Sequence, residues 1–437
     1  SREPLLRLKG GALRDRLQLP RQCAINTFFN DMMGGYIIGP YLNEYYNGHD
    51  DEFHRQVADV DARIQLVMDL RRGKLLKVFP YTVNGNTTWY APTDIMPDSA
   101  VAPADRQYMQ NVFSLIYQEA LAGNMASVGN IADKMLRYQH KTGGSSLPSG
   151  MQTQAERLYN ALPFATILFM LNLGMGFATL FAVLWLMTRP TRRTLRGSML
   201  MKIAVAVMLL SFAALTLCAA LRWLIRGTAP MANGYETMLL MAWIIMAASL
   251  LLCRRFAIVL TFGFIMSGFF LLVSHISQMD PQITHIMPVL QSPLLSIHVS
   301  VIMTAFALLS LTFICGITAL LLRAMRGSRA EGLAAQLAAL RALSQLFYYP
   351  AMAALAVGIF VGAVWANVSW GTYWSWDAKE VWALITFMVY AAAAHGTSLP
   401  MMRRPMPWHV FMVAAFATIL MTYFGVNYFL GGMHSYA

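Results

Sequence analysis

The sequence predicts an all-α polytopic membrane protein with about eight transmembrane helices, preceded by an N-terminal external region of mixed α/β structure. Three observations support this fold class. Of 437 residues, 57% are hydrophobic and only 12% are charged, about half the charged share of a soluble domain. Apolar stretches long enough to span a membrane recur through the C-terminal two-thirds. Arginines gather in the short segments between these stretches.

The N-terminal region, residues 1–160, is polar and contains no apolar stretch of spanning length. Short strand-like segments occur around Lys74–Tyr81 and Thr87–Tyr90. Apolar residues near helical spacing predict a longer helix from about Asp105 to Tyr138. The stretch GGSSLPSG at 143–150 is typical of a linker. We therefore expect an external domain over 1–160 and a transmembrane domain over 161–437.

Eight apolar segments are expected to span the membrane. They lie at about 163–187, 200–222, 236–253, 256–275, 297–322, 344–366, 379–397 and 408–430.

The arginines between these segments predict the orientation of the helices. They are Arg189, Arg192, Arg193 and Arg196; Arg254 and Arg255; Arg323, Arg326, Arg329 and Arg341; and Arg403 and Arg404. Cytoplasmic loops carry such an excess of Lys and Arg. If all of these arginines lie inside, the threading places the following parts outside: the N-terminal region, the segments 223–235, 276–296 and 367–378, and the C-terminus. Arg222 and Arg226 then fall on the outer side as exceptions.

This threading explains most of the formal charge of +12, so the basic character indicates a lipid bilayer and not a nucleic acid as the partner. An external N-terminal region must be exported, and no segment that would export it occurs in this sequence. We therefore expect further membrane helices upstream.

Cysteine and methionine suggest no chemistry of their own. The four cysteines form no CxxC or CxxCH motif, which argues against a redox dithiol or a self-attached haem. Buried cysteine as a small apolar residue is the expected role. The 31 methionines are scattered along the apolar segments, where packing explains them better than copper binding.

The most unusual stretch is WANVSWGTYWSWDAKEVW, which contains Trp365, Trp370, Trp374, Trp376 and Trp382. It lies at the predicted external face between two apolar segments. Tryptophans are common at membrane interfaces because the indole ring is amphipathic. Such an aromatic belt usually supplies only one or two tryptophans per helix end. Five in eighteen residues favour a flat aromatic surface for a ligand.

Two acidic residues in this stretch, Asp377 and Glu380, would be costly at the membrane interface without a partner. Lys379 or the polar part of a ligand are the candidate partners.

Two histidines are expected on the same face as the tryptophans. His298 opens the fifth apolar segment, and His434 follows the eighth. Two neutral imidazoles at a dry aromatic surface provide what bis-histidine ligation of haem iron needs. Structural, hydrogen-bonded histidines are the alternative.

The remaining histidines are harder to assign. His395 lies 18 residues after Asp377, about 27 Å along a straight helix, so it approaches the inner side. It is a candidate ligand where haem enters, or an ordinary helix-end histidine. His275 and His285 border the external segment before His298 and have no assigned role. His49, His54, His140 and His409 have no constellation around them.

The motif WGTYWSWDAKEVWALI, followed by His395 and the terminal GGMHSYA, resembles the tryptophan-rich WWD signature of haem-handling membrane proteins. The similarity is to the CcsA family, the membrane half of the system II cytochrome c synthase, and it covers residues 163–437. The WWD loop itself is expected at 365–382. Ala378 departs from the family, in which proline often follows the aspartate.

The resemblance implies that haem b crosses from the cytoplasmic side and is presented by the WWD loop between two external histidines. These map to His298 and His434, and His395 maps to an inner ligand. The resemblance also implies a holocytochrome c synthase (haem lyase) that joins haem to the CxxCH motif of apocytochrome c. It further implies a ResB/CcsB-like half as partner and a bacterial inner-membrane location.

The sequence contains no nucleophile–base pair, which suits a site that acts by positioning its reactants. Three alternatives remain: a CcmC- or CcmF-like haem-delivery component, a haem-binding assembly scaffold, and a transporter with a tryptophan-rich gate. A transporter predicts inverted repeats or broken helices, which the sequence does not show.

Overall fold

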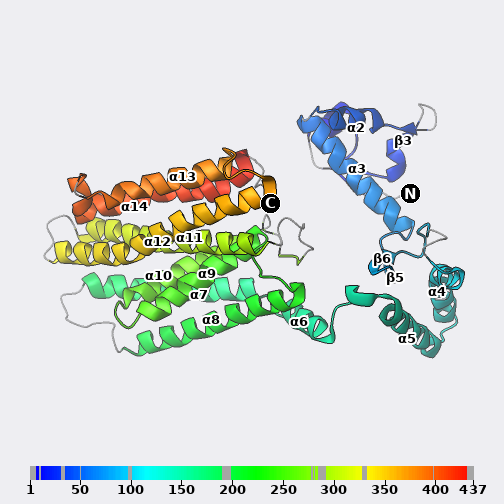
Figure 1. Ribbon diagram of the computed structural model, residues 1–437, viewed down its shortest axis with the longest axis horizontal. Coiled ribbons are helices and arrows are strands. Elements are labelled where there is room, and N and C mark those ends of the chain that lie inside the picture. The colour runs from blue at the N-terminus through cyan, green and yellow to red at the C-terminus, as the bar shows by residue number, and fades with distance from the viewer. Residues whose placement is uncertain are drawn as a thin grey trace. The chain divides into compact units, whose positions relative to one another are not determined.

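The computed structural model describes residues 6–8, 11–30, 35–49, 51–96, 101–188, 198–276, 279, 281–283, 292–326, 332–396 and 398–430. The chain divides into two compact units, Ser1–Pro148 and Ser149–Ala437. Figure 1 labels their helices and strands.

The first part of the N-terminal unit packs around one long helix, α3. Its elements are β1 (Leu6–Arg7), α1 (Ala12–Arg16), β2 (Gln22–Cys23), η1 (Ile25–Phe28), β3 (Phe29–Asn30), β4 (Gly35–Tyr36), α2 (Gly39–Tyr46) and α3 (Glu52–Arg71). β1 pairs antiparallel with β2, and β3 with β4. Val57 and Ile64 of α3 are fully buried and form the centre of this small core.

The second part contains a β-hairpin and two helices. β5 (Phe79–Val83) pairs with β6 (Asn86–Tyr90), and Asn84 and Gly85 both have positive φ at the turn, as the favoured two-residue hairpin turn requires. The helices are α4 (Pro103–Leu121) and α5 (Met125–Thr142), followed by the short η2 (Gly144–Ser146). The prediction of mixed α/β structure is confirmed.

The prediction of one helix over 105–138 is wrong. The chain turns between α4 and α5 at Gly123, whose φ of 75° is left-handed, a conformation that glycine adopts at low cost. The stretch expected as a linker contains η2 and the start of α6. Ser149 and Gln152 form a capping box there.

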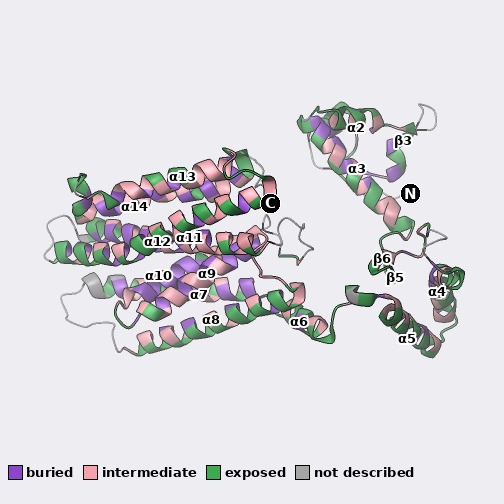
Figure 2. Cartoon of the chain, in the orientation of Figure 1, coloured by how far each residue is buried: buried purple, intermediate pink, exposed green. Residues whose placement is uncertain are grey.

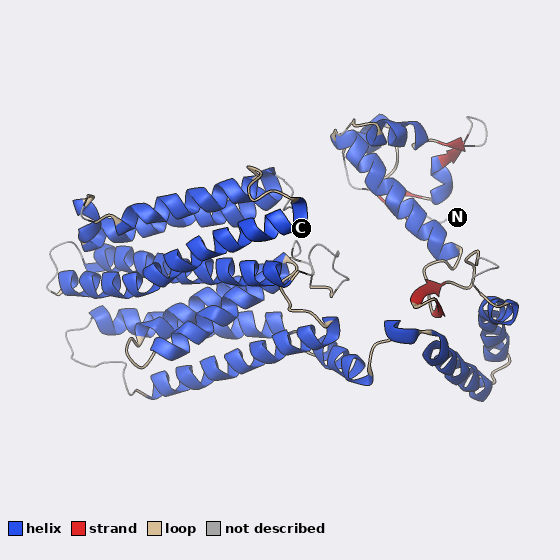
Figure 3. Cartoon of the chain, viewed as in Figure 1, coloured by secondary structure: helices blue, strands red, loops and turns tan. Residues whose placement is uncertain are grey.

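The second unit is a bundle of long helices (Figure 3). Its elements are α6 (Gly150–Ala161), α7 (Phe164–Thr188), α8 (Met199–Arg226), α9 (Gly234–Leu252), α10 (Ile258–His275), α11 (Pro293–Arg326), α12 (Leu333–Trp370), α13 (Ala378–Ala391), η4 (Ala392–Ala394), η5 (Pro400–Arg403), α14 (Pro405–Leu420) and the π-helical η6 (Met421–Leu430).

Among the described residues, 7 helices are long and apolar enough to cross a membrane, so the multi-pass fold class is confirmed. The expected segment 379–397 is α-helical only over Ala378–Ala391, because the chain tightens into η4 before Gly396. α13 and η4 together rise about 27 Å, close to the thickness of a hydrocarbon core. They carry the chain from one end of the bundle to the other (Figure 1).

Successive membrane helices run antiparallel, as the predicted threading requires (Figure 1). The α9–α10 connection with Arg254 and Arg255 and the α13–α14 turn with Arg403 and Arg404 lie at one end. The α8–α9 and α12–α13 connections lie at the other end. We call these the basic end and the tryptophan end.

Burial differs strongly among the helices (Figure 2). The apolar window of α10 is 67% buried, whereas that of α8 is 28% buried. α10 packs closely on α7 because Gly176 and Gly268 remove side chains at the contact: an added Cβ would lie 2.9 Å from Ile265 and 2.8 Å from Leu173, respectively. Small residues allow this approach between membrane helices.

A buried polar network reinforces the α7–α8–α10 contact. Asn172 of α7 donates to Ser267 of α10 at 3.1 Å and accepts from Ser211 of α8 at 2.8 Å. All three side chains are fully buried. Such hydrogen bonds between membrane helices each contribute about 0.6–2 kcal/mol.

The two arginines that departed from the charge pattern are explained by a buried ion cluster at the tryptophan end. Arg222 donates through Nε and Nη2 to one carboxylate oxygen of Glu236, at 3.0 and 2.7 Å. Arg226 donates to the other oxygen at 2.7 Å. Arg222 also binds the Tyr159 hydroxyl at 2.6 Å and the Pro281 carbonyl at 2.8 Å. The cluster therefore joins α6, α8 and α9.

A histidine in the N-terminal unit, His54, has two acidic partners that the sequence analysis missed. His54 is 5% exposed. Its Nδ1 lies 2.6 Å from Asp51 Oδ1 and its Nε2 lies 2.9 Å from Glu44 Oε2. The hydrogen bond to Glu44 and the contacts with Asp51 raise the pKa of His54 against the opposing effect of burial. A backbone hydrogen bond from His54 lowers the pKa of Asp51.

Removing the charge of Glu236 should destabilise the membrane unit strongly. Glu236→Gln leaves Arg222 buried without its counter-charge, and breaking a buried pair in this way costs about 3–5 kcal/mol. We expect a large loss of thermal stability in detergent. Glu156→Gln, at an exposed position of α6, is the matched control and should change little. Equal melting of both variants would contradict this role.

The raised pKa of His54 predicts a pH dependence of the N-terminal unit. Protonated His54 stabilises the fold fully below its unfolded pKa of about 6.5, and this contribution is lost as pH rises through the folded pKa. Hydrogen exchange in α3 should therefore accelerate above pH ~6.5 beyond the intrinsic rate. His54→Gln should remove this excess acceleration, whereas His140→Gln should keep it. An unchanged profile in His54→Gln would refute the assignment.

Candidate functional site

The predicted WWD loop joins α12 to α13 at the tryptophan end of the bundle. α12 ends at Trp370, and Gly371 caps it in the left-handed region with φ 81°. α13 begins at Ala378, after the N-cap residue Asp377. Trp376, just before this cap, has a φ of 59°. A bulky residue in the left-handed region stores about 1–3 kcal/mol of strain.

The two acidic residues shape this loop. Asp377 is 9% exposed and accepts a hydrogen bond from the Lys379 backbone N–H at 3.0 Å. Glu380 accepts from the backbone N–H groups of Ser375 and Asp377, at 2.9 and 3.3 Å. The Asp377 side chain also accepts from the Glu380 backbone N–H, so Asp377 and Glu380 form a capping box. Backbone donors thus provide the partners that the carboxylates need, and contact between Asp377 and a ligand stays a prediction.

The tryptophans form two edge-to-face pairs. Trp365 is buried, and its ring centroid lies 4.9 Å from that of Trp370 with an interplanar angle of 69°. Trp374 and Trp376 lie 6.0 Å apart at 89°. Trp376 is 76% exposed. A large indole held outward on strained backbone offers an aromatic contact surface.

Trp382 connects the loop to the C-terminal helix through its backbone. Thr422 of η6 donates to the Trp382 carbonyl at 3.1 Å and lies 2.8 Å from the Thr386 hydroxyl. In the same π-helical segment, the Tyr423 hydroxyl lies 2.6 Å from the Thr237 hydroxyl of α9. η6 is therefore held by hydrogen bonds on two sides. π-helical segments frequently occur at functional sites.

His298 of α11 lies in a glycine-lined notch on α12. Its Nδ1 is 2.8 Å from the Gly358 carbonyl oxygen. An added Cβ at Gly362 would lie 2.5 Å from the imidazole Cε1. One at Gly358 would lie 2.5 Å from the side chain of Ile302. α11 and α12 therefore approach as closely as a G-x-x-x-G face allows.

The hydrogen bond to Gly358 determines the tautomer of His298. A carbonyl oxygen only accepts, so Nδ1 carries the proton and Nε2 carries the lone pair of the neutral ring. Gly362 precedes Trp365 by three residues, about 4.5 Å along the helix axis. The imidazole consequently lies within one helical turn of the first tryptophan of the loop.

The other predicted histidines are placed as follows. His395 is exposed and ends η4 at the basic end, opposite to Asp377. His275 ends α10, where its Nδ1 lies 3.2 Å from the Thr166 hydroxyl and its ring packs on Phe169. His434 and His285 lie outside the described residues.

Sequence reasoning missed two contacts that α12 makes with neighbouring helices. One is the notch of Gly358 and Gly362, whose signal is the G-x-x-x-G spacing in GIFVG. The other is His409, which is fully buried and whose Nε2 lies 3.2 Å from the Leu337 carbonyl oxygen. It thereby joins α14 to α12 near the basic end.

The chain is thus a helical membrane protein with a tryptophan-rich loop at one end of its bundle and a histidine held between two closely packed helices, and comparison with known proteins shows its family. The profile of a family described as "Cytochrome C assembly protein" matches residues 231–434. The chain is 30% identical to Protein NrfI of Wolinella succinogenes over 99% of this chain and 48% of NrfI.

The chain also resembles two proteins named cytochrome c biogenesis protein CcsA. The one from Chlamydomonas reinhardtii is 31% identical over 51% of this chain and 65% of that protein. The one from Synechococcus sp. (strain CC9605) is 33% identical over 54% of this chain and 86% of that protein. The chain belongs to the CcsA family of cytochrome c assembly proteins, and its role lies in cytochrome c biogenesis. It spans about half the length of NrfI.

Adding one methyl group in the notch should disturb α11 and α12. Gly362→Ala places Cβ 2.5 Å from the His298 ring, and such overpacking costs about 1–3 kcal/mol. Gly174→Ala in α7 is the matched control, because an added Cβ there meets nothing within 4 Å. We expect thermal unfolding to show a loss for Gly362→Ala and no loss for Gly174→Ala. Equal stability of the two variants would show that the notch is not tightly packed.

Proposed function

We propose that this chain presents haem b at the tryptophan end of its bundle for covalent attachment to the CxxCH motif of apocytochrome c. The single observation that supports this most strongly is the position of His298. It lies between two closely packed helices, within one helical turn of Trp365 along the helix axis, in the tautomer that places the lone pair of the ring on Nε2. Membership in the family indicates a role in cytochrome c biogenesis, and the position of His298 suggests how the chain contributes to that process.

His298 is suited to ligate haem iron. Metal-binding histidines commonly donate their other ring N–H to a carbonyl or carboxylate, which fixes the ring and raises its basicity. The Gly358 carbonyl provides this contact at 2.8 Å. The ring is only partly exposed, and Gly362 leaves it room against α12. We therefore assign His298 as one axial ligand of the external haem.

The second external ligand is proposed to be His434, on the strength of the family resemblance and its place in the chain. It follows η6, which Thr422 joins to the Trp382 carbonyl. The flat haem would then lie against the loop tryptophans, with Trp376 the most exposed of those in the loop. Aromatic contacts of this kind each contribute about 0.5–1.5 kcal/mol beyond burial.

His395 is proposed as an inner ligand that receives haem from the cytoplasmic side. It is exposed in the α13–α14 turn at the basic end. α13 and η4 join the tryptophan loop to His395 and together rise about 27 Å. Haem bound at His395 would have to travel about this distance to reach the loop. We propose the bacterial inner membrane, with the basic end in the cytoplasm, because basic loops stay inside.

The chemistry needs orientation more than side-chain catalysis. Each cysteine thiol of CxxCH adds across the double bond of one haem vinyl group. Sulfur bonds to the inner vinyl carbon, and the outer carbon gains one proton in place of the proton that the thiol loses. No electrons are gained or lost overall. Holding two vinyls and two thiols in register supplies rate by proximity. The histidine of the substrate motif would replace one external histidine on the iron.

A ResB/CcsB-like half is the proposed partner. The chain covers 48% of NrfI, which leaves room in that relative for further segments. With such a partner, the holocytochrome c synthase (haem lyase) activity is the function that we assign. Delivery of haem without attachment is the alternative that the experiment below separates.

Replacing His298 should abolish the external haem site. We expect the purified parent to show a low-spin reduced haem spectrum, and His298→Gly to lose haem or become high-spin. Added imidazole should restore the low-spin spectrum of His298→Gly by occupying the vacated position. His275→Ala, at the same end, is the matched control and should retain the parent spectrum.

The same variants should be tested for cytochrome c formation in cells with a CxxCH reporter and the partner half. A reporter yield that falls in His298→Gly and is kept in His275→Ala would support attachment at this site. Normal yield in a His298→Ala/His434→Ala double variant would overturn the proposal. Haem binding without any thioether product in the complete system would assign delivery alone.

A further inference from the structure

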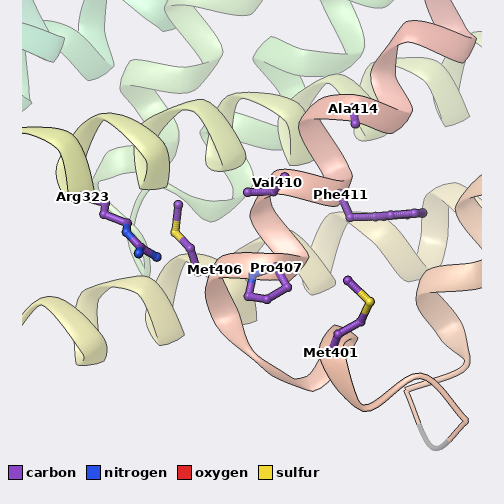
Figure 4. A pocket seen from close by; sticks show the side chains of 7 residues that line it. All are labelled: Arg323, Met401, Met406, Pro407, Val410, Phe411 and Ala414. Atoms are coloured by element: carbon purple, nitrogen blue, oxygen red, sulfur yellow. The ribbon is translucent and has the colours of Figure 1, made fainter. Parts of the chain in front are cut away.

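A groove lies at the basic end of the bundle, apart from the tryptophan loop (Figure 4). Its volume is about 450 Å³, and its lining comes from α11, η5 and α14. Arg323 of α11 lies at one end of the lining in this view and Phe411 of α14 at the other, with Met406 and Val410 between them. The lining has a cationic end and an apolar body.

The orientation of this groove follows from the helices that form it. Arg323 lies in the last turn of α11, which ends at Arg326 at the basic end. α14 starts at Pro405 at that same end and runs toward the tryptophan end, so Ala414 lies about 10 Å deeper than Pro407. The cationic group therefore sits at the depth of lipid headgroups, and the apolar lining continues toward the hydrocarbon.

Arg323 is available to a ligand. Its side chain is exposed, and no hydrogen bond or ion pair joins it to another residue within the described ranges. Arg403 and Arg404 of the neighbouring turn are exposed as well. An exposed arginine at one end of an apolar groove complements a molecule with an anionic head and an apolar tail.

We propose that this groove binds an anionic phospholipid of the cytoplasmic leaflet, with its phosphate on Arg323 and an acyl chain along Val410, Phe411 and Ala414. Basic pockets between membrane helices at the cytoplasmic side recognise anionic headgroups in this way. The planar guanidinium matches phosphate geometry. The inference is independent of the haem proposal.

A phospholipid fits this lining better than haem does. Haem needs an axial ligand, for which histidine, cysteine, tyrosine or methionine serves. Among the described residues that line the groove there is no histidine, and Met401 and Met406 are the candidate ligands. Of its seven described residues, six are apolar: five of them lie on α14, and Met401 lies on η5. Haem binding is therefore the rival that the test must exclude.

Native mass spectrometry of the delipidated full chain tests the proposal. Phosphatidylglycerol and phosphatidylethanolamine with identical acyl chains are titrated, because they differ in headgroup charge. We expect tighter binding of phosphatidylglycerol to the parent, and a loss of about fivefold in Arg323→Gln, since one basic residue contributes about 1 kcal/mol. Arg323→Lys should keep the preference in large part.

Two further variants distinguish lipid binding in the groove from general contact between lipids and the bundle. Ala414→Phe fills the apolar body and should weaken both lipids, while Arg255→Gln removes an exposed arginine at the same end but outside the groove and should change neither. Equal binding of the two lipids by the parent, or an unchanged preference in Arg323→Gln, would overturn the proposal. Displacement of phosphatidylglycerol by one equivalent of haem, lost in Met401→Leu/Met406→Leu, would assign the groove to haem instead.

Discussion

The close approach of α11 and α12 at Gly358 and Gly362 is the contact on which the tryptophan end depends. Neither glycine leaves room for a methyl group, because the imidazole of His298 and the side chain of Ile302 occupy that space. The notch sets both the position of His298 and the direction in which α12 leads to the tryptophans. A looser helix pair would separate the histidine from the aromatic surface that we propose it serves.

Several polar groups inside the bundle have partners on other helices, and these contacts join helices that the apolar pattern alone would leave free to slide. Arg222 and Glu236 connect α8 with α9, and Asn172 connects α7 with α8 and α10. At the loop, Glu380 satisfies backbone donors and so fixes where α13 begins. Membrane helices gain little from hydrophobic contact with one another, which gives these few hydrogen bonds a large share of the specificity.

Much of the fold could be predicted from the sequence because long apolar runs and basic connections are local signals. The helix ends could not: α13 is shorter than its apolar run, and Gly123 interrupts a pattern that is continuous in hydrophobicity. For the proposed site, residue type and position in the sequence make the tryptophans and His298 candidates. The notch around His298 required the partner helix 60 residues away, and the pairing of Glu44 with His54 depended on how α2 and α3 pack. The G-x-x-x-G spacing in GIFVG marks a close helix contact, but no local signal shows which helix or which side chain meets it there.

The most direct test of the account is an electron cryomicroscopy map of the complete haem-loaded protein in a lipid nanodisc. We expect haem density at the tryptophan end, in contact with Nε2 of His298 and flanked by indoles of the loop. Density only beside His395, or at a place away from both histidines and the loop, would contradict the claim that this end presents haem for attachment.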